Sequence, residues 1–470
     1  MTINTPMLWV VFPMFVSATL AILYRRRLLS TILTSITGFG LGALAAFFPE
    51  ELFIAFGPLQ LTFVESLTIL GRQLSITYQI LPFIAFIYIA TGLWGLGSVL
   101  PSVPDNFRPI SLVVTALLTA ALSVEPFLYA ALFIQAAILF SIPMLSPLEM
   151  KTDPGILRYL SLETLAMPLI LLAGWLLSGV ETLPPDSPLI VQSMIILGLG
   201  IGLWLAVFPF HSWVPMVSEK SHPMALSFVL FIFPTIIALF SLNFFDRYTF
   251  LRTFETLYQA LLIIGALMVV LGGLWTAYQE NIKRAFGYSF MVETGFILLA
   301  IGLSNQAGLH WLLLLFPIHA MGFWLWGFAL SLILKKADSQ FVKQLKGFAR
   351  RYPIISTGLI IAQLSIAGLP LLGTFPIKIA MLSEVFTNGV ALGLWIFVGN
   401  IGLFVFSIRL LVSLVQPDEQ QRGNAWTVLE KRQVYIPLIL MILLIILTGL
   451  FPNGIQSNIT KILTTFTHLQ

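Results

Sequence analysis

A small set of ionisable side chains lies inside apolar stretches of this 470-residue chain, where proton transfer is the chemistry they could perform. The set consists of Glu125, Glu163, Glu293, His319, Lys378, Glu384 and Arg409. An ionisable group at the centre of a bilayer costs on the order of 3 kcal/mol to insert, so each one needs a structural or a functional reason. Lys378 is well placed for function because it follows Pro376, in a Gly and Pro cluster, by two residues, and a lysine near a helix break can exchange protons.

Each of these residues also has an ordinary structural interpretation. Lys378 and Arg409 could extend their charged groups to the membrane surface. Glu293 and His319 could hydrogen-bond to a neighbouring helix. Glu163 follows Arg158 by one and a half turns, which predicts a position near the cytoplasmic boundary.

Composition indicates the class of protein. Hydrophobic residues make up 58% of the chain and charged residues 9%, whereas a soluble domain carries roughly 25% charged residues. The sequence therefore predicts an all-α polytopic membrane protein. The absence of cysteine excludes disulfides, thiolate metal sites and iron–sulfur ligation, and the dispersed net charge of +4 does not favour nucleic-acid binding.

Charge-free stretches predict about fourteen transmembrane helices. They cover residues 7–24, 28–48, 76–99, 108–124, 126–144, 156–180, 189–209, 224–245, 257–277, 286–304, 307–334, 353–387, 389–415 and 435–452. We expect one membrane domain over 1–470, with a core at about 76–415. Alternating apolar and polar residues predict a small extramembrane hairpin within 49–75.

Some spans carry helix-breaking residues. Pro168 predicts a break in the sixth span, and Gly368, Pro370, Gly373 and Pro376 predict another in the twelfth. Near the end of the seventh span stands PFHSWVP, in which prolines remove backbone donors. Broken helices at membrane depth usually line a polar cavity, because their freed backbone groups need partners.

Lys and Arg residues predict the orientation of the chain. Most of the 24 fall in loops that follow odd-numbered spans, including the basic loop from Lys335 to Arg351. By the positive-inside rule these loops are cytoplasmic, and both termini lie on the non-cytoplasmic side. We expect a bacterial inner membrane or a thylakoid membrane.

Three motifs carry a resemblance to a known family. PFHSWVP, with Pro209, His211 and Trp213, ENIKRAFGYS before the tenth span, and AGLPLLGTFPIK, with Gly368 and Pro370, follow one another in the family's order. They resemble motifs of the antiporter-like proton-conducting subunits of respiratory and photosynthetic complex I and of the large subunits of Mrp-type cation/proton antiporters. The resemblance implies a fourteen-helix core, and we interpret His211 as a helix-end anchor rather than a catalytic group.

The resemblance also implies a proton path. Glu125, in SVEPFLYAALFIQ, falls where the family has a fifth-helix glutamate that begins the path. Lys378 falls where many members have a twelfth-helix lysine that opens to the outer side, and His319, in LFPIHAMGFW, resembles an eleventh-helix histidine. Glu293, in YSFMVETG, occupies a place where histidine or glutamine is more usual. The expected path is thus Glu125, Glu293, His319 and Lys378.

Two departures separate this sequence from the family pattern. The family's seventh-helix lysine falls at Trp204 here, and the lysine four residues after the eleventh-helix histidine falls at Phe323. In the usual scheme the central lysine is coupled to the fifth-helix glutamate, so its absence bears directly on proton pumping.

Three functions remain open. The first is a proton-translocating membrane subunit of a complex I-like NAD(P)H/quinone oxidoreductase, in which partner subunits perform the redox chemistry and contact the quinone. The second is a subunit of a Mrp-type cation/proton antiporter, or of a related ion-coupled carbon-uptake complex, that moves protons or sodium ions. The third is a non-conducting scaffold. In each case the partners are other membrane subunits, and we expect no cofactor, no metal and no catalytic residue in this chain.

Overall fold

A computed structural model describes most of the chain. The described residues are 2–23, 25–48, 53–56, 59–69, 71–100, 102–146, 153–177, 187–337, 339–417, 432–454, 466 and 468–469. They fold into two compact units, the first formed by Met1–Trp204 and Ile232–Phe244 and the second by Leu205–Phe231 and Phe245–Gln470.

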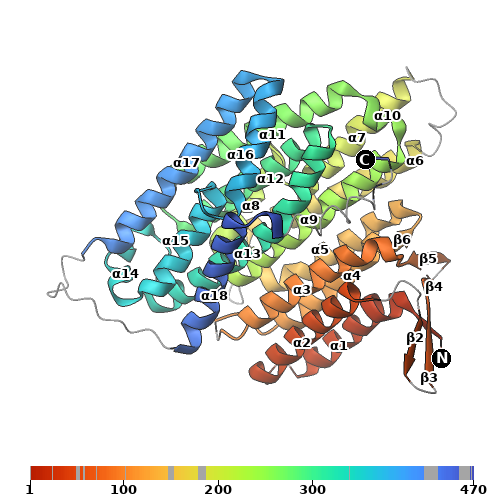
Figure 1. The fold of residues 1–470 in the computed structure, drawn as a ribbon, viewed down its shortest axis with the longest axis horizontal. Coiled ribbons are helices and arrows are strands. Elements are labelled where there is room, and N and C mark those ends of the chain that lie inside the picture. Colours follow the sequence, from red (N-terminus) through yellow and green to blue (C-terminus); the bar gives the residue numbers. More distant parts are fainter. Residues whose placement is uncertain are drawn as a thin grey trace. The chain divides into compact units, whose positions relative to one another are not determined.

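The first unit is built from antiparallel apolar helices (Figure 1). These are α1 (Phe12–Ile22), α2 (Arg27–Ala46), α3 (Leu81–Gly97), α4 (Phe107–Ser123), α5 (Ala130–Leu145), α6 (Pro154–Leu177) and α7 (Pro188–Trp204). The long helix α9 (Pro223–Arg247) contributes Ile232–Phe244 to this unit.

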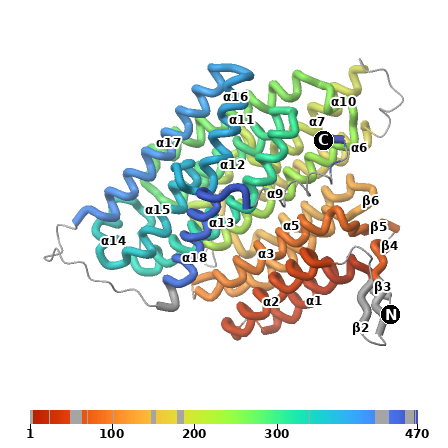
Figure 2. The backbone as a smooth tube through the Cα atoms, in the orientation of Figure 1, coloured from red at the N-terminus to blue at the C-terminus, as the bar shows by residue number. Residues whose placement is uncertain are grey.

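The second unit holds the remaining helices, which Figure 2 traces as a tube from α8 to α18. They are α8 (Trp213–Lys220), α10 (Thr249–Thr253), α11 (Glu255–Tyr278), α12 (Ile282–Gly302), α13 (Gln306–Ala337), α14 (Phe348–Arg351), α15 (Pro353–Ala367), α16 (Thr374–Asn388), α17 (Val390–Val415) and α18 (Arg432–Leu450).

The helices confirm an all-α polytopic membrane fold. Among the described residues, 9 helices are long and apolar enough to cross a membrane, and further apolar helices of 10–17 residues accompany them. Each predicted span overlaps one of the helices above, except that the twelfth overlaps two, α15 and α16. Residues 178–180 of the sixth span lie outside the described part of the chain. The count of fourteen transmembrane helices stays a prediction.

Short strands occur where the sequence predicts one hairpin within 49–75, namely β2 (Phe53–Phe56), β3 (Leu59–Val64), β4 (Ser66–Ile69) and β5 (Arg72–Ser75). Two strands from other parts of the chain pair with them, β1 (Thr2–Asn4) and β6 (Val124–Glu125). Two antiparallel hairpins form, β2–β3 and β4–β5, and they belong to two sheets of strand order β1-β3-β2 and β4-β5-β6. Residues 49–52, 57–58 and 70 lie outside the described residues. The extramembrane position of this segment and the single membrane domain stay predictions.

The predicted break at Pro168 is wrong, whereas the breaks in the seventh and twelfth spans occur. Helix α6 runs through Pro168 without interruption. Neighbouring helices and local adjustment let a membrane helix tolerate one proline, so a lone proline does not predict a break. The twelfth span divides into α15 and α16, where Gly368 takes a φ of +79°, a left-handed conformation that favours glycine. The seventh ends at Trp204 and is followed by the 3₁₀ helix Phe210–Ser212 and by α8.

Glycines bring α11 and α17 into backbone contact in the second unit (Figure 2). A Cβ added at Gly399 would lie 2.6 Å from the carbonyl carbon of Val269, and one added at Gly402 would lie 2.5 Å from the carbonyl carbon of Gly273. Small residues allow such close approach, which is how helices gain packing energy in lipid.

We expect Gly399→Ala to destabilise the protein by about 1–3 kcal/mol, because the added methyl group overpacks the α11–α17 contact. The matched control is Gly322→Ala in α13, where an added Cβ meets nothing within 4 Å. Alanine is the better helix former, so the control should be neutral or slightly stabilising. Thermal unfolding of the two purified variants in detergent gives the comparison, and equal midpoints would contradict the packing argument.

His222 caps the start of α9 at the corner that follows α8. Its Nδ1 accepts a hydrogen bond from the Met224 backbone N–H at 3.2 Å. Burial disfavours the charged imidazole and the nearby Lys283 repels a proton, which together lower the pKa of His222 to about 3.

This lowered pKa makes folding stability depend on pH. The unfolded chain takes up a proton on His222 below pH of about 6.5, whereas the folded chain resists protonation until about 3. We therefore expect this contribution to be fully present above the unfolded pKa and lost progressively as the pH falls from about 6.5 toward 3. His222→Asn keeps a capping acceptor that does not titrate, so its unfolding midpoint should depend less on pH over this interval.

Candidate functional site

A buried cluster of ionisable side chains forms in the second unit, where α16 meets the consecutive helices α12 and α13. Glu293 on α12 places its carboxylate between Lys378 on α16 and His319 on α13. Lys378 Nζ donates a hydrogen bond to Glu293 Oε1 at 2.6 Å, and His319 Nε2 pairs with Glu293 Oε2. We call Glu293, His319 and Lys378 the carboxylate triad.

The carboxylate triad is almost fully enclosed by protein. The exposed fractions are 2% for Glu293, 6% for His319 and 5% for Lys378. Buried charges are stable only when they are paired and hydrogen-bonded, and removing one partner of such a pair typically costs about 3–5 kcal/mol. Each oxygen of the carboxylate has its own cationic or polar partner, so the pairing is complete.

The break between α15 and α16 supplies the rest of the lysine's environment. Lys378 Nζ also donates to the backbone carbonyl of Ile366 at 2.5 Å and lies 4.4 Å from the ring centroid of Phe296. The last carbonyls of a helix have no intrahelical partner and carry partial negative charge, which favours a cation there. In the same break, the Thr374 hydroxyl donates to the carbonyl of Ser365.

Aromatic packing fills the place where the family pattern has an eleventh-helix lysine. Phe323 is buried, and its ring stacks on His319 with centroids 5.7 Å apart. Phe286 packs edge-on against Phe323 at 5.0 Å and stacks on Trp326 at 3.6 Å. The triad therefore ends, on this side, at an apolar wall rather than at another ionisable group.

Two buried neutral polar residues, Gln363 and Ser289, lie near the triad, and the sequence search missed them. Gln363 on α15 is fully buried, and its Nε2 donates to Ser289 Oγ on α12 at 3.1 Å. Ser289 precedes Glu293 by one helical turn, so the two side chains lie on the same face of α12. A search for ionisable residues has no signal for such a pair, because the serine hydroxyl and the glutamine amide are neutral groups.

Glu125 belongs to the first unit and is not part of the carboxylate triad. It lies in β6, where it pairs with Gln73 of β5, and its side chain is exposed. Its place at the start of the proton path stays a prediction.

The side chain of Glu163 is buried within the protein. Its predicted position near the cytoplasmic boundary of the membrane stays a prediction. Its exposed fraction is 2%, and its backbone carbonyl accepts a hydrogen bond from Trp204 Nε1 at 3.1 Å. Of the other two ionisable residues, Arg409 donates to the carbonyl of Ala277, and Glu384 accepts a bond from Asn388 through its backbone carbonyl.

The PFHSWVP residues act as packing groups. His211 stacks between Phe208 and Trp275, with ring centroids 5.6 and 5.1 Å away. Trp213 is buried at the start of α8, directly after the turn that holds Pro209. This packing agrees with the interpretation of His211 as an anchor of a helix end.

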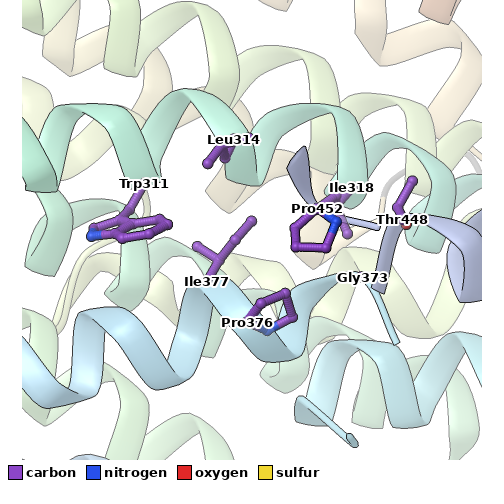
Figure 3. A pocket seen from close by; sticks show the side chains of 8 residues that line it. All are labelled: Trp311, Leu314, Ile318, Gly373, Pro376, Ile377, Thr448 and Pro452. Atoms are coloured by element: carbon purple, nitrogen blue, oxygen red, sulfur yellow. The ribbon is translucent and has the colours of Figure 1, made fainter. Parts of the chain in front are cut away.

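An apolar pocket of about 100 Å³ lies beside α13 and α16 (Figure 3). Its lining consists of Trp311, Leu314, Ile318, Gly373, Pro376, Ile377, Thr448 and Pro452. Ile318 and Ile377 directly precede His319 and Lys378, but the lining itself contains no ionisable side chain. The pocket lining therefore offers no side chain for proton transfer.

The described residues contain no group of three or more His, Cys, Asp or Glu side chains that could hold a metal ion. The triad has only two potential ligands of that kind, and Lys378 occupies the remaining side of the carboxylate. Its arrangement suits the sharing of protons between a carboxylate, an imidazole and an amine.

Gly368 holds the break that positions Lys378. A Cβ added there would lie 3.3 Å from Lys378 Cδ, on a backbone with a φ of +79°. We expect Gly368→Ala to cost about 1–3 kcal/mol of stability, because a non-glycine residue in this region is strained and the lysine must shift. The control is Gly389→Ala, whose φ of 174° is extended and whose added Cβ would make only ordinary contacts with Leu392. Unfolding midpoints in detergent test the pair, and a loss as large in the control would contradict the role given to Gly368.

Comparison with known proteins places this site in a family. Residues 182–403 match the family described as "NADH:quinone oxidoreductase/Mrp antiporter, TM". The chain is 28% identical over 274 residues to a "Hydrogenase-4 component F homolog" of Methylacidiphilum infernorum, covering 57% of this chain and 55% of that protein. It is 26% identical over 383 residues to "NADH-quinone oxidoreductase subunit N" of Acinetobacter baumannii, covering 74% of each. The chain thus spans little more than half the length of the first of these relatives.

A solved structure shows the same fold. In the Mrp complex from Dietzia sp. DQ12-45-1b, one chain superposes with a TM-score of 0.79 at 14% identity, covering 99% of this chain and 96% of that chain. The resemblance carried by the three sequence motifs is thereby confirmed, because residues 182–403 of this chain match the transmembrane family that NADH:quinone oxidoreductases and Mrp antiporters share.

Proposed function

We propose that this chain is a membrane subunit that translocates protons in a complex I-like NAD(P)H/quinone oxidoreductase assembly. The observation that carries the proposal is the carboxylate of Glu293, buried and shared by Lys378 and His319. Ionisable residues inside membrane bundles mark ion pathways and proton relays, because their insertion is costly. The similarity to a quinone oxidoreductase subunit supports this class of assembly.

The triad can pass a proton without leaving a charge unpaired. Transfer from Lys378 to Glu293 converts a buried ion pair into two neutral groups, and the reverse transfer restores the pair. His319 contacts the other carboxylate oxygen, so a proton can reach or leave Glu293 from that side. The carbonyl of Ile366 and the ring of Phe296 stabilise the protonated form of Lys378 between transfers.

In this scheme the redox chemistry belongs to partner subunits, and this chain binds no cofactor. Its partners are other membrane subunits, and quinone is met only through them. Glu125 is the first group of the proposed path, ahead of Glu293, His319 and Lys378. We place the chain in a bacterial inner membrane or a thylakoid membrane, with both termini on the non-cytoplasmic side, on the distribution of Lys and Arg residues.

A Mrp-type cation/proton antiporter subunit, or a subunit of a related ion-coupled carbon-uptake complex, is the second candidate. The fold similarity to a chain of a Mrp complex and the family description, which names both assemblies, support it. Sodium ions would then move in exchange for protons. A third candidate, a non-conducting scaffold, is favoured by the apolar packing of Trp204 and Phe323, which stand where the family pattern has lysines.

Proton transport by membrane vesicles that contain the assembled complex tests the proposal. We expect Lys378→Ala, Glu293→Gln and Glu125→Gln each to reduce proton uptake at least about tenfold, because each removes a proton-carrying group. Glu384→Gln is the matched control, since Glu384 lies on α16 outside the triad. The amount of assembled complex must be measured in each case, because a single substitution in the triad leaves a buried charge unpaired.

The outcomes separate the three candidates. Proton uptake that follows quinone reduction supports the first, whereas uptake driven by a sodium gradient without an electron donor supports the antiporter. If Lys378→Ala and Glu125→Gln both transport as the wild type does, the assignment of the proton path is wrong. Wild-type vesicles that move neither ion would identify a scaffold.

A further inference from the structure

Glu163 is a buried carboxyl group in the first unit that the path proposed above does not use. It lies on α6 with an exposed fraction of 2%, and its Oε1 has no hydrogen-bond partner among the described residues. A buried polar group normally has a partner, so a carboxyl oxygen without one calls for an explanation. None of the ion pairs in the described part of the chain includes Glu163.

The helices packed against α6 offer no charge that could balance a carboxylate. The sequences of α5 and α7 contain no ionisable side chain, and the same is true of the α9 segment Ile232–Phe244. The short segment Phe127–Tyr129 adds one phenol, Tyr129. On α6 itself, Arg158 is exposed and Tyr159 is buried. An unpaired carboxylate is far more costly in such surroundings than a protonated carboxyl group.

The position of Glu163 along its helix corresponds to the middle of a membrane. It follows Pro154, the first residue of α6, by nine positions, which is about 14 Å at a rise of 1.5 Å per residue. Half the thickness of a hydrocarbon core is about 15 Å. At this level Trp204, the last residue of α7, donates its indole N–H to the backbone carbonyl of Glu163, so the seventh span breaks off beside this residue.

Hydroxyl groups lead from the start of α6 toward Glu163. Tyr159 precedes Glu163 by four residues and therefore lies on the same face of α6. Its hydroxyl is 2.9 Å from Ser141 Oγ on α5, and Ser141 already donates its single proton to the carbonyl of Ile138. Tyr159 is therefore the donor in this pair, and its oxygen keeps lone pairs that can accept a hydrogen bond from a protonated carboxyl group.

We propose that Glu163 is a proton-binding site of the first unit, which takes up and releases a proton at the level where the seventh span breaks. This inference rests on the proposed function, since it adds a carrier to the proton path. The only bond that forms and breaks is the carboxyl O–H bond: the carboxyl gains a proton when the path is loaded and gives it up when the path discharges. Tyr159 and Ser141 are positioning residues that connect Glu163 to the α5–α6 end of the unit.

Infrared difference spectroscopy on the assembled complex detects the proton directly. Protonated carboxyl groups give a separate carbonyl stretching band, and we expect one such band to be lost completely in Glu163→Gln and kept in Glu293→Gln. If every protonated-carboxyl band of the wild type also appears unchanged in Glu163→Gln, Glu163 carries no proton and the proposal is overturned. This readout does not depend on transport, so it tests the site even if the proposed function fails.

Transport and stability measurements separate a proton carrier from a structural group. We expect Glu163→Gln to reduce proton uptake at least about tenfold and Glu163→Asp to retain part of it, since only the aspartate can bind a proton. Glu163→Leu should also stop uptake while raising the unfolding midpoint by about 2 °C or more, because it removes a buried polar group without a partner. Ser161→Ala, on the exposed face of α6, is the control.

Wild-type uptake in Glu163→Gln would contradict the inference, as would a lowered midpoint in both Glu163→Gln and Glu163→Leu, which would indicate a structural carboxyl group. If the wild-type complex moves no protons at all, the proposed function fails, and the infrared band still decides whether Glu163 binds a proton.

Discussion

The second unit depends on one constraint: a charge buried in a membrane bundle must be matched by another. Lys378, Glu293 and His319 satisfy it together, because the two oxygens of one carboxylate serve two partners on two other helices. Removing any member leaves a group that protein alone cannot stabilise. The arrangement thus fixes α12, α13 and α16 relative to one another. It also places three groups that can bind a proton in contact with one another, so their titrations are coupled.

The break between α15 and α16 makes this charge balance possible. An unbroken helix would satisfy its own carbonyls, whereas the end of α15 leaves the carbonyl of Ile366 for the lysine ammonium group. Gly368 permits the left-handed turn at which α15 ends, and Thr374 binds the carbonyl of Ser365 as α16 begins. Backbone geometry and side-chain chemistry are therefore parts of one structure, and a substitution in the turn acts on the lysine although it carries no charge.

Aromatic residues replace lysines at two places, with different structural results. Phe323 closes one side of the triad by stacking on His319 and packing against Phe286. The indole N–H of Trp204 instead donates to the backbone carbonyl of Glu163. The break in the seventh span therefore lies next to a residue whose carboxyl group is buried. An acidic group at this level carries a proton as a neutral species, whereas a lysine carries it as a cation, so the two solutions need opposite partners.

The sequence by itself determined the class of the protein, the places of its spans and the identity of the triad's members. Low charge and long apolar runs leave no other fold class, and the family resemblance implied Glu293, His319 and Lys378, together with Glu125, as ionisable groups of interest. Only the tertiary structure decided that these three meet, that α6 passes through Pro168, and that the Glu163 side chain is enclosed by protein. The physical reason is that hydropathy records how costly a residue is to bury, while contacts between distant helices decide whether that cost is met.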